Sequence, residues 1–107
     1  MNIETELLNI FIAKHPEYSS HLEFIKVENR KITGVGMYIN FEYEHNEITY
    51  EMVDFIFSNN ETIYVDNLTY GLGYEIDITN GQINFIEFFA YGEPWNGEFE
   101  NYKIIKD

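Results

Sequence analysis

The dipeptide Asn80-Gly81 constrains the fold of this chain more than any other feature of its sequence. It stands between two runs of alternating residues, "GYEIDIT" and "QINFIEFFAY". Asn and Gly both tolerate the positive φ of a type I′ turn, and such a pair between alternating runs is the strongest short-range hairpin signal. The sequence therefore predicts a β-hairpin that reverses at residues 80 and 81.

The turn also predicts which residues of the hairpin face each other. Counting outward from it gives the pairs Thr79 with Gln82, Ile78 with Ile83, Asp77 with Asn84, Ile76 with Phe85 and Glu75 with Ile86. The predicted core face consists of Tyr74, Ile76, Ile78, Ile83 and Phe85. Beyond Ile86 the alternation breaks down. Either this end is covered on both faces, or a bulge at Phe88-Phe89 shifts the alternation.

The rest of the chain predicts one helix and several strands. Apolar residues at helical spacing indicate a helix over 2–13 that ends near Lys14, because Pro16 cannot simply continue it. Strand character follows at 22–27, a polar turn at 28–31, an alternating strand from Met37, a turn at 58–60 and a strand from Glu61. The strand from Met37 is expected to be half-buried: its inward row is Met37, Ile39, Phe41 and Tyr43, and its acidic outer row is Tyr38, Asn40, Glu42 and Glu44. Segment 46–57 fits a helix or a strand, with strand favoured. Residues 101–106 predict an edge strand guarded by lysines.

These elements together predict the fold class. We expect an α+β fold in which an N-terminal helix precedes a mostly antiparallel twisted sheet of about five to seven strands. The chain has 107 residues, a length typical of one domain, so residues 1–107 are expected to form a single domain.

Charge and composition narrow the class of partner. Six Lys and Arg against 19 Asp and Glu give a formal net charge of −13, which repels nucleic-acid phosphates and anionic membranes. A basic protein is the natural complement, although acidity can also serve solubility alone. The chain has no cysteine and no apolar run long enough to span a membrane. We expect a cytoplasmic protein.

Catalytic and cofactor signals are weak. The serines at 19, 20 and 58 lie in turn-like contexts without a nucleophile elbow. The three histidines lack the spacing of a metal motif. The pairs "GVG" and "GLG" lack the context of a phosphate-binding loop. The sequence predicts no enzyme, no cofactor and no metal.

Two groups of acidic and aromatic residues are candidate partner-binding sites. We call them the 42–54 cluster and the 91–98 cluster. The first consists of Glu42, Glu44, Glu47, Tyr50, Glu51 and Asp54, and the second of Tyr91, Glu93, Trp95 and Glu98. Aromatic rings supply desolvated contact area, while carboxylates capture Arg and Lys and steer the encounter. The alternative is that Trp95 packs as a lid over the hairpin and the glutamates are a solvated face.

A short, acidic, cysteine-free chain that carries "GLGYEIDITNGQINFIEFFAYGEPW" resembles the small immunity proteins of bacterial contact-dependent inhibition and related polymorphic toxin systems. The resemblance implies a cytoplasmic protein that binds a cognate toxin domain, often a basic nuclease, and blocks its active site or substrate groove without catalysis. Two alternatives stay open: a small-ligand or carbohydrate-binding domain that uses the aromatics of 85–91 and Trp95, and an acidic mimic of nucleic acid. The oligomeric state is not predicted.

Overall fold

The computed structural model describes residues 2–44 and 51–106. Helix α1 spans Ile3–Lys14, as the sequence predicts. Asn2 caps it, because the Asn2 side chain accepts a hydrogen bond of 3.0 Å from the Thr5 N–H. Two glutamates in the first turn and Lys14 in the last complement the helix dipole. The helix buries Leu7 and Phe11 completely against the sheet.

The chain does not enter a strand directly after Pro16. Residues Pro16–Glu23 form a 3₁₀ helix, η1, with Pro16 at its first position, where a missing N–H costs nothing. Strand β1 begins only at Ile25 and ends at Ile32. The strand predicted over 22–27 is therefore wrong for Leu22 to Phe24 and confirmed from Ile25 on.

Strand β1 also contains residues 28–31, which the sequence predicted as a turn. The polar side chains are tolerated because β1 is an edge strand and most of it is exposed. One of them, Asn29, accepts a hydrogen bond of 2.8 Å from Asn40 on β2 (Gly36–Tyr43). The reversal comes later, where Gly34 has a φ of 92° and the Thr33 N–H donates to the Gly36 carbonyl.

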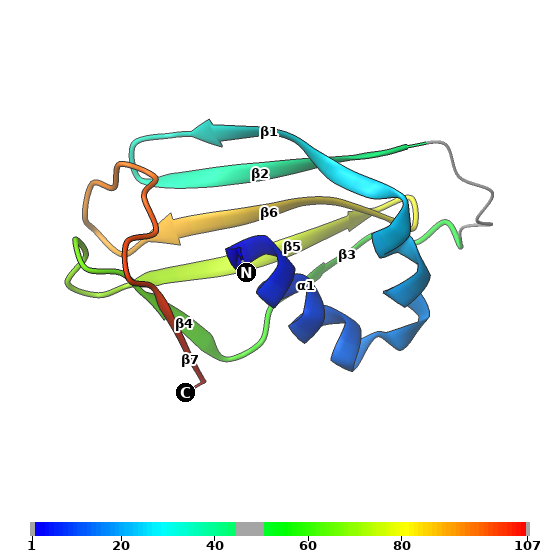
Figure 1. Cartoon of the computed structure of the whole chain (residues 1–107), viewed down its shortest axis with the longest axis horizontal. Coiled ribbons are helices and arrows are strands. Elements are labelled where there is room, and N and C mark those ends of the chain that lie inside the picture. The colour runs from blue at the N-terminus through cyan, green and yellow to red at the C-terminus, as the bar shows by residue number, and fades with distance from the viewer. Residues whose placement is uncertain (1, 45–50, 107) are drawn as a thin grey trace.

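Within residues 2–44 and 51–106, seven strands form one antiparallel sheet, whose arrangement Figure 1 shows. After β1 and β2 come β3 (Phe55–Phe57), β4 (Glu61–Tyr64), β5 (Leu72–Thr79), β6 (Gln82–Ala90) and β7 (Lys103–Lys106). Their order across the sheet is β1-β2-β6-β5-β4-β7, and β3 pairs with β5. The predicted helix and antiparallel sheet are confirmed, but the fold is largely sheet, so the α+β class is only partly right.

Residues 58–60 do not reverse the chain, contrary to the predicted turn. Strands β3 and β4 both pair with β5, through Phe57 with Ile76 and Ile63 with Leu72. They thus lie one after the other along the same side of β5, separated by residues 58–60. Within the ambiguous segment 46–57, only 55–57 is strand and 51–54 has no regular structure. Residues 46–50 lie outside the described residues.

The hairpin is confirmed at its turn, and its predicted register is wrong further out. Asn80 and Gly81 have φ values of 53° and 74°, as a type I′ turn requires. The register then shifts, so that Asp77 pairs with Phe85 instead of Asn84. Asn84 is the extra residue of a β-bulge, four residues before the position proposed from the sequence.

The bulge decides which side chains of β6 enter the core. Strict alternation from Ile83 would turn Phe85 and Glu87 inward. With the bulge, Ile86 and Phe88 point inward instead, at 0% and 1% exposure, and Glu87 stays on the opposite face. A carboxylate is thereby kept out of an apolar interior, where its burial would be costly.

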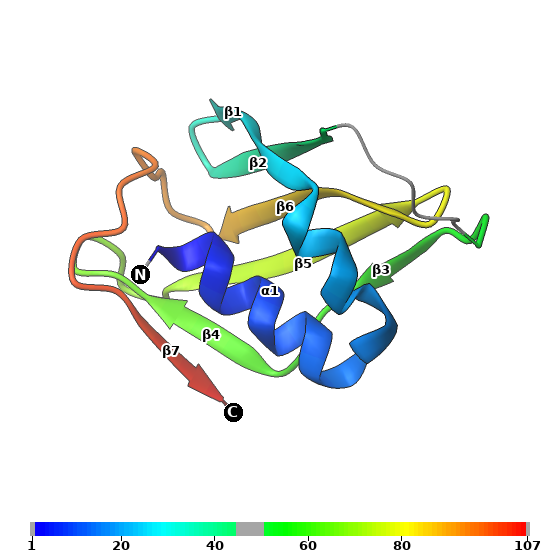
Figure 2. The same cartoon turned by 45° about the vertical axis from the view of Figure 1, so that its right-hand side comes forward.

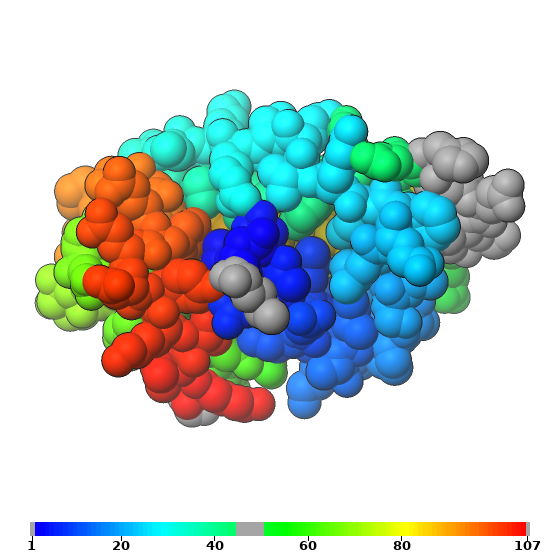
Figure 3. Space-filling model, viewed as in Figure 1, coloured from blue at the N-terminus to red at the C-terminus, as the bar shows by residue number. Residues whose placement is uncertain are grey.

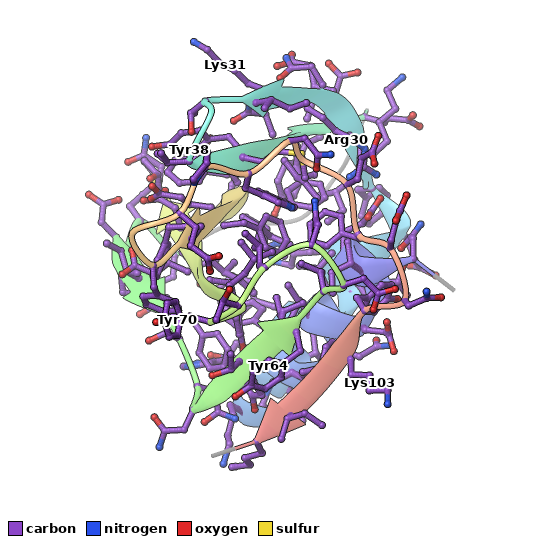
Figure 4. The ribbon with its side chains drawn as sticks, turned by 90° about the vertical axis from the view of Figure 1, so that its left-hand side faces the viewer. Arg30, Lys31, Tyr38, Tyr64, Tyr70 and Lys103 are labelled. Atoms are coloured by element: carbon purple, nitrogen blue, oxygen red, sulfur yellow. The ribbon has the colours of Figure 1, made fainter. Side chains whose placement is uncertain are left out.

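The core lies between the sheet and the N-terminal helices (Figure 2). Seen along the long axis, the sheet curls around this core, with α1 on its inner side (Figure 4). Within 2–44 and 51–106, no helix or strand covers the opposite side, which we call the outer face.

Two side-chain hydrogen bonds fix the first turn of α1. Arg30 of β1 donates to the buried carboxylate of Glu4. Tyr102, just before β7, donates to Glu6, and this bond raises the pKa of Tyr102 to about 12. The helix start therefore lies between β1 and the C-terminal segment (Figure 3).

The bulged register and the unbulged register predict different core residues in β6, so two alanine substitutions can distinguish them. Ile86→Ala should destabilise the protein by about 3 kcal/mol, because it opens a cavity in the core. Phe85→Ala should cost only about 1 kcal/mol, since Phe85 makes a cross-strand contact on the outer face. Urea unfolding of both variants measures this. The opposite ranking would show that Phe85 is the core residue.

Candidate protein-binding face

The outer face is built by the three central strands. Alternation within β2, β6 and β5 turns one set of side chains away from α1: Tyr38, Asn40, Glu42, Glu75, Asp77, Phe85, Glu87 and Phe89. All eight are half-buried, as expected for side chains that shield only one another. Figure 4 shows Tyr38 on the side of the sheet away from α1.

Charge is divided between the middle and the edges of the sheet. The strands β2, β5 and β6 carry four acids and no base. Five of the six Lys and Arg lie in the edge strands: Lys26, Arg30 and Lys31 in β1, and Lys103 and Lys106 in β7. Basic edge residues discourage pairing with other strands. The middle of the outer face is left acidic.

Two carboxylates oppose each other at the centre of this face. Glu75 of β5 pairs directly with Glu87 of β6, a position where like charges destabilise a sheet. Glu87 accepts a hydrogen bond of 3.1 Å from the Tyr38 hydroxyl, and this bond raises the pKa of Tyr38. The Glu75 carboxylate makes no hydrogen bond or ion pair with any residue in 2–44 or 51–106. A cation placed between the two carboxylates would relieve their repulsion.

Aromatic rings lie beside these carboxylates. The ring of Phe85 stands edge-on to Tyr38 at 5.2 Å, and Phe89 to Tyr91 at 5.8 Å. The exposed Tyr70 lies on the same side of the molecule as Tyr38 (Figure 4). An open face with half-buried rings and unneutralised acids has the composition of a surface that binds a basic protein.

The structure scatters the predicted 42–54 cluster. Glu42 and Glu44 both bind Lys26, at 3.3 and 3.2 Å, so their charge is partly neutralised. Asp54 accepts a hydrogen bond of 2.7 Å from the Asn80 N–H and so supports the hairpin turn. Glu51 is exposed and lies near Tyr18, away from the outer face. Two further members, Glu47 and Tyr50, lie outside the described residues.

The 91–98 cluster lies at the opposite end of the long axis (Figure 1). Trp95 is only 3% exposed and packs against Phe99 at 5.0 Å, so it serves the core. Its indole N–H donates to the Glu98 carbonyl, whereas the Glu98 side chain and Tyr91 are exposed. The two predicted clusters are therefore not brought together.

Glu93 has a structural role within that cluster. Its carboxylate accepts hydrogen bonds of 3.0 Å from the N–H groups of both Thr69 and Tyr70. These bonds lower the pKa of Glu93, because they favour its charged form. Glu93 thus holds the loop before β5 against the loop after β6.

Sequence analysis missed the centre of the outer face, although part of the signal was present. Alternation from Met37 correctly placed Tyr38 and Glu42 outward. The pairing of Glu75 with Glu87 was hidden, because the unbulged register sets Glu75 against Ile86. The useful signal was Glu87. Strict alternation continues the inward row from Ile83 and Phe85 to position 87, and a charged residue at an inward position indicates a bulge.

No group of three or more His, Asp and Glu within 2–44 and 51–106 could hold a metal ion. No helix of the described residues is long and apolar enough to cross a membrane. Comparisons with protein-family models, curated proteins and solved structures give no match.

The role of Glu93 can be tested by its titration. Its pKa is lowered, so the stabilisation it provides is present above the unfolded pKa and is lost as pH falls through the folded pKa. An NMR titration should show Glu93 ionising below its ordinary value of 4.5. In Glu93→Gln, the amides of Thr69 and Tyr70 should exchange faster with solvent. Unchanged exchange would show that the two bonds do not hold the loops.

Proposed function

We propose that this protein is an immunity protein that binds a cognate basic toxin domain through the outer face of its sheet and blocks the toxin's active site or substrate groove. The observation that carries the proposal is the pair Glu75 and Glu87. The two carboxylates oppose each other on an uncovered face, with no base on the central strands. This arrangement costs stability in the free protein and becomes favourable when a partner supplies a cation.

The mechanism follows from charge and ring contacts. An acidic face competes with nucleic-acid phosphates for the Lys and Arg side chains of a nuclease-like toxin. Electrostatic steering raises the association rate, and desolvated rings such as Phe85 and Phe89 hold the complex once formed. No chemistry is required of the inhibitor. Its place of action is the cytoplasm, where the toxin's substrate lies.

The opposed carboxylates predict a conflict between stability and binding. Glu75→Gln should stabilise the free protein by about 0.5 kcal/mol, because it removes a like-charge pair in the sheet. Urea unfolding at low salt measures this. Glu98→Gln is the matched control, since Glu98 is exposed and away from the face, and it should change stability by less. Equal effects of the two changes would show that the pair is not repulsive.

Partner capture tests the proposed function itself. The purified protein is used as bait in extracts of its source cells at low and moderate salt, and the retained protein is identified and purified. We expect a basic toxin domain whose activity falls to zero at an equimolar ratio of this protein. Association should slow as salt rises, while dissociation changes less.

A charge-reversed bait locates the interface. Glu75→Lys with Glu87→Lys should abolish retention and inhibition, whereas Glu98→Lys with Glu100→Lys, an equal change of charge elsewhere, should leave both intact. A retained protein whose activity is unaffected at equimolar ratio would refute the inhibitor function. Equal retention by both double variants would refute the assignment of the face.

A further inference from the structure

A separate pocket lies beside η1, away from the outer face. It has a volume of about 400 Å³ and is lined by His15, Glu17, Tyr18, His21, Glu51 and Phe55 among others. The lining residues come from the end of α1, from η1, from the segment that leads into β3 and the first residue of β3, and from the β5–β6 turn at Gly81. Four parts of the chain thus meet around one opening.

Aromatic rings form much of the wall of this pocket. The rings of His15 and Phe55 lie 5.2 Å apart, and those of Tyr18 and His21 lie 4.8 Å apart. Tyr18 and Phe55 contact each other edge-on at 6.2 Å. Aromatic faces attract cations, and cages of several rings bind alkylated ammonium groups.

Tyr18 supplies the observation that points to a ligand. The residue as a whole is only 6% exposed, and its hydroxyl makes no hydrogen bond with any residue in 2–44 or 51–106. The hydroxyl oxygen itself is not fully buried, which is consistent with an opening onto the pocket that Tyr18 lines. A phenol hydroxyl that opens onto a pocket can donate a hydrogen bond to a ligand or accept one from it. Burial raises the pKa of Tyr18, and the charges of Glu17 and Glu51 raise it further, which places both carboxylates near the ring. An unpartnered hydroxyl therefore lines the pocket between two acids.

The charged groups around the pocket select the class of ligand. Glu17 and Glu51 are exposed carboxylates that would repel an anion. His15 lies 3.6 Å from Glu17, and burial lowers the pKa of His21 because it disfavours the charged form of the ring. Tyr18 and both carboxylates present oxygen acceptors. A ligand rich in N–H donors with a positive charge satisfies the acceptors and the rings together.

We propose that this pocket binds a guanidinium or alkylammonium group. The group can belong to an Arg or Lys side chain of a protein or to a free amine. In either case its charge lies near Glu17 and Glu51, its N–H groups reach the Tyr18 oxygen, and its alkyl portion packs on the rings. The site does not depend on the proposed function, because it lies on a different surface.

The test is an NMR titration of the full chain with n-butylguanidinium and n-butylammonium chloride. We expect saturable shifts of the Tyr18, His15 and His21 ring signals, with a dissociation constant in the millimolar range. Glu17→Gln with Glu51→Gln should weaken binding roughly fivefold or more, which corresponds to about 1 kcal/mol. Tyr18→Phe keeps the ring and should weaken guanidinium binding about twofold.

Matched controls keep the test decisive. Glu98→Gln with Glu100→Gln removes the same charge at the other end of the molecule and should leave the dissociation constant unchanged. Shifts that do not saturate, or the same dissociation constant in both double variants, would overturn the site. Sodium chloride at equal ionic strength should not reproduce the shifts.

Two further ligands identify the source of the cation. N-acetyl-arginine methylamide carries the guanidinium on a peptide-like backbone, and spermidine is a free polyamine. Binding of the arginine derivative at least as tight as that of butylguanidinium assigns the pocket to a protein side chain. Preferential binding of spermidine assigns it to a free amine. If neither of these two ligands binds, and neither n-butylguanidinium nor n-butylammonium binds, the proposal is refuted.

Discussion

The bulge at Asn84 is the constraint on which the core and the outer face both depend. Without it, β6 would turn Glu87 into the core and expose Ile86 and Phe88. With it, two large apolar side chains are fully buried, and Glu87 meets Glu75 on the outer face. One extra residue thus stabilises the interior and creates the like-charge pair that makes the outer face attractive to a cation.

Local signals predicted the local structure well. The Asn80-Gly81 turn, the helix that ends at Lys14 and the inward row that begins at Met37 rest on short-range chemistry, and the structure has them. The errors concern context. The polar residues 28–31 look like a turn, but they form a strand because an edge position leaves them in solvent. Which strand becomes an edge is a tertiary property that a single sequence does not state.

The predicted site residues show why residue type alone does not identify a binding surface. Asp54 and Glu93 were chosen as acids beside aromatics, and each accepts backbone hydrogen bonds that hold a turn or loop. Trp95 was chosen as an aromatic anchor, with packing over the hairpin as the alternative, and it lies in the core. Conversely, Glu75 attracts attention only through its neighbour across the strand, which depends on the register. The bulge was the missing information, because it sets the register that brings Glu75 and Glu87 together on one face.

The positions of the few Lys and Arg residues determine where the surface of the sheet is acidic. Five of six Lys and Arg lie in β1 and β7, where they protect both open edges of the sheet against pairing with other chains. Because those bases are used at the edges, β2, β5 and β6 have none, and the acids of the outer face are left without nearby compensation except at Lys26. The same placement that keeps the sheet from aggregating therefore concentrates negative charge at its centre. A partner that meets this face has to bring the positive charge itself.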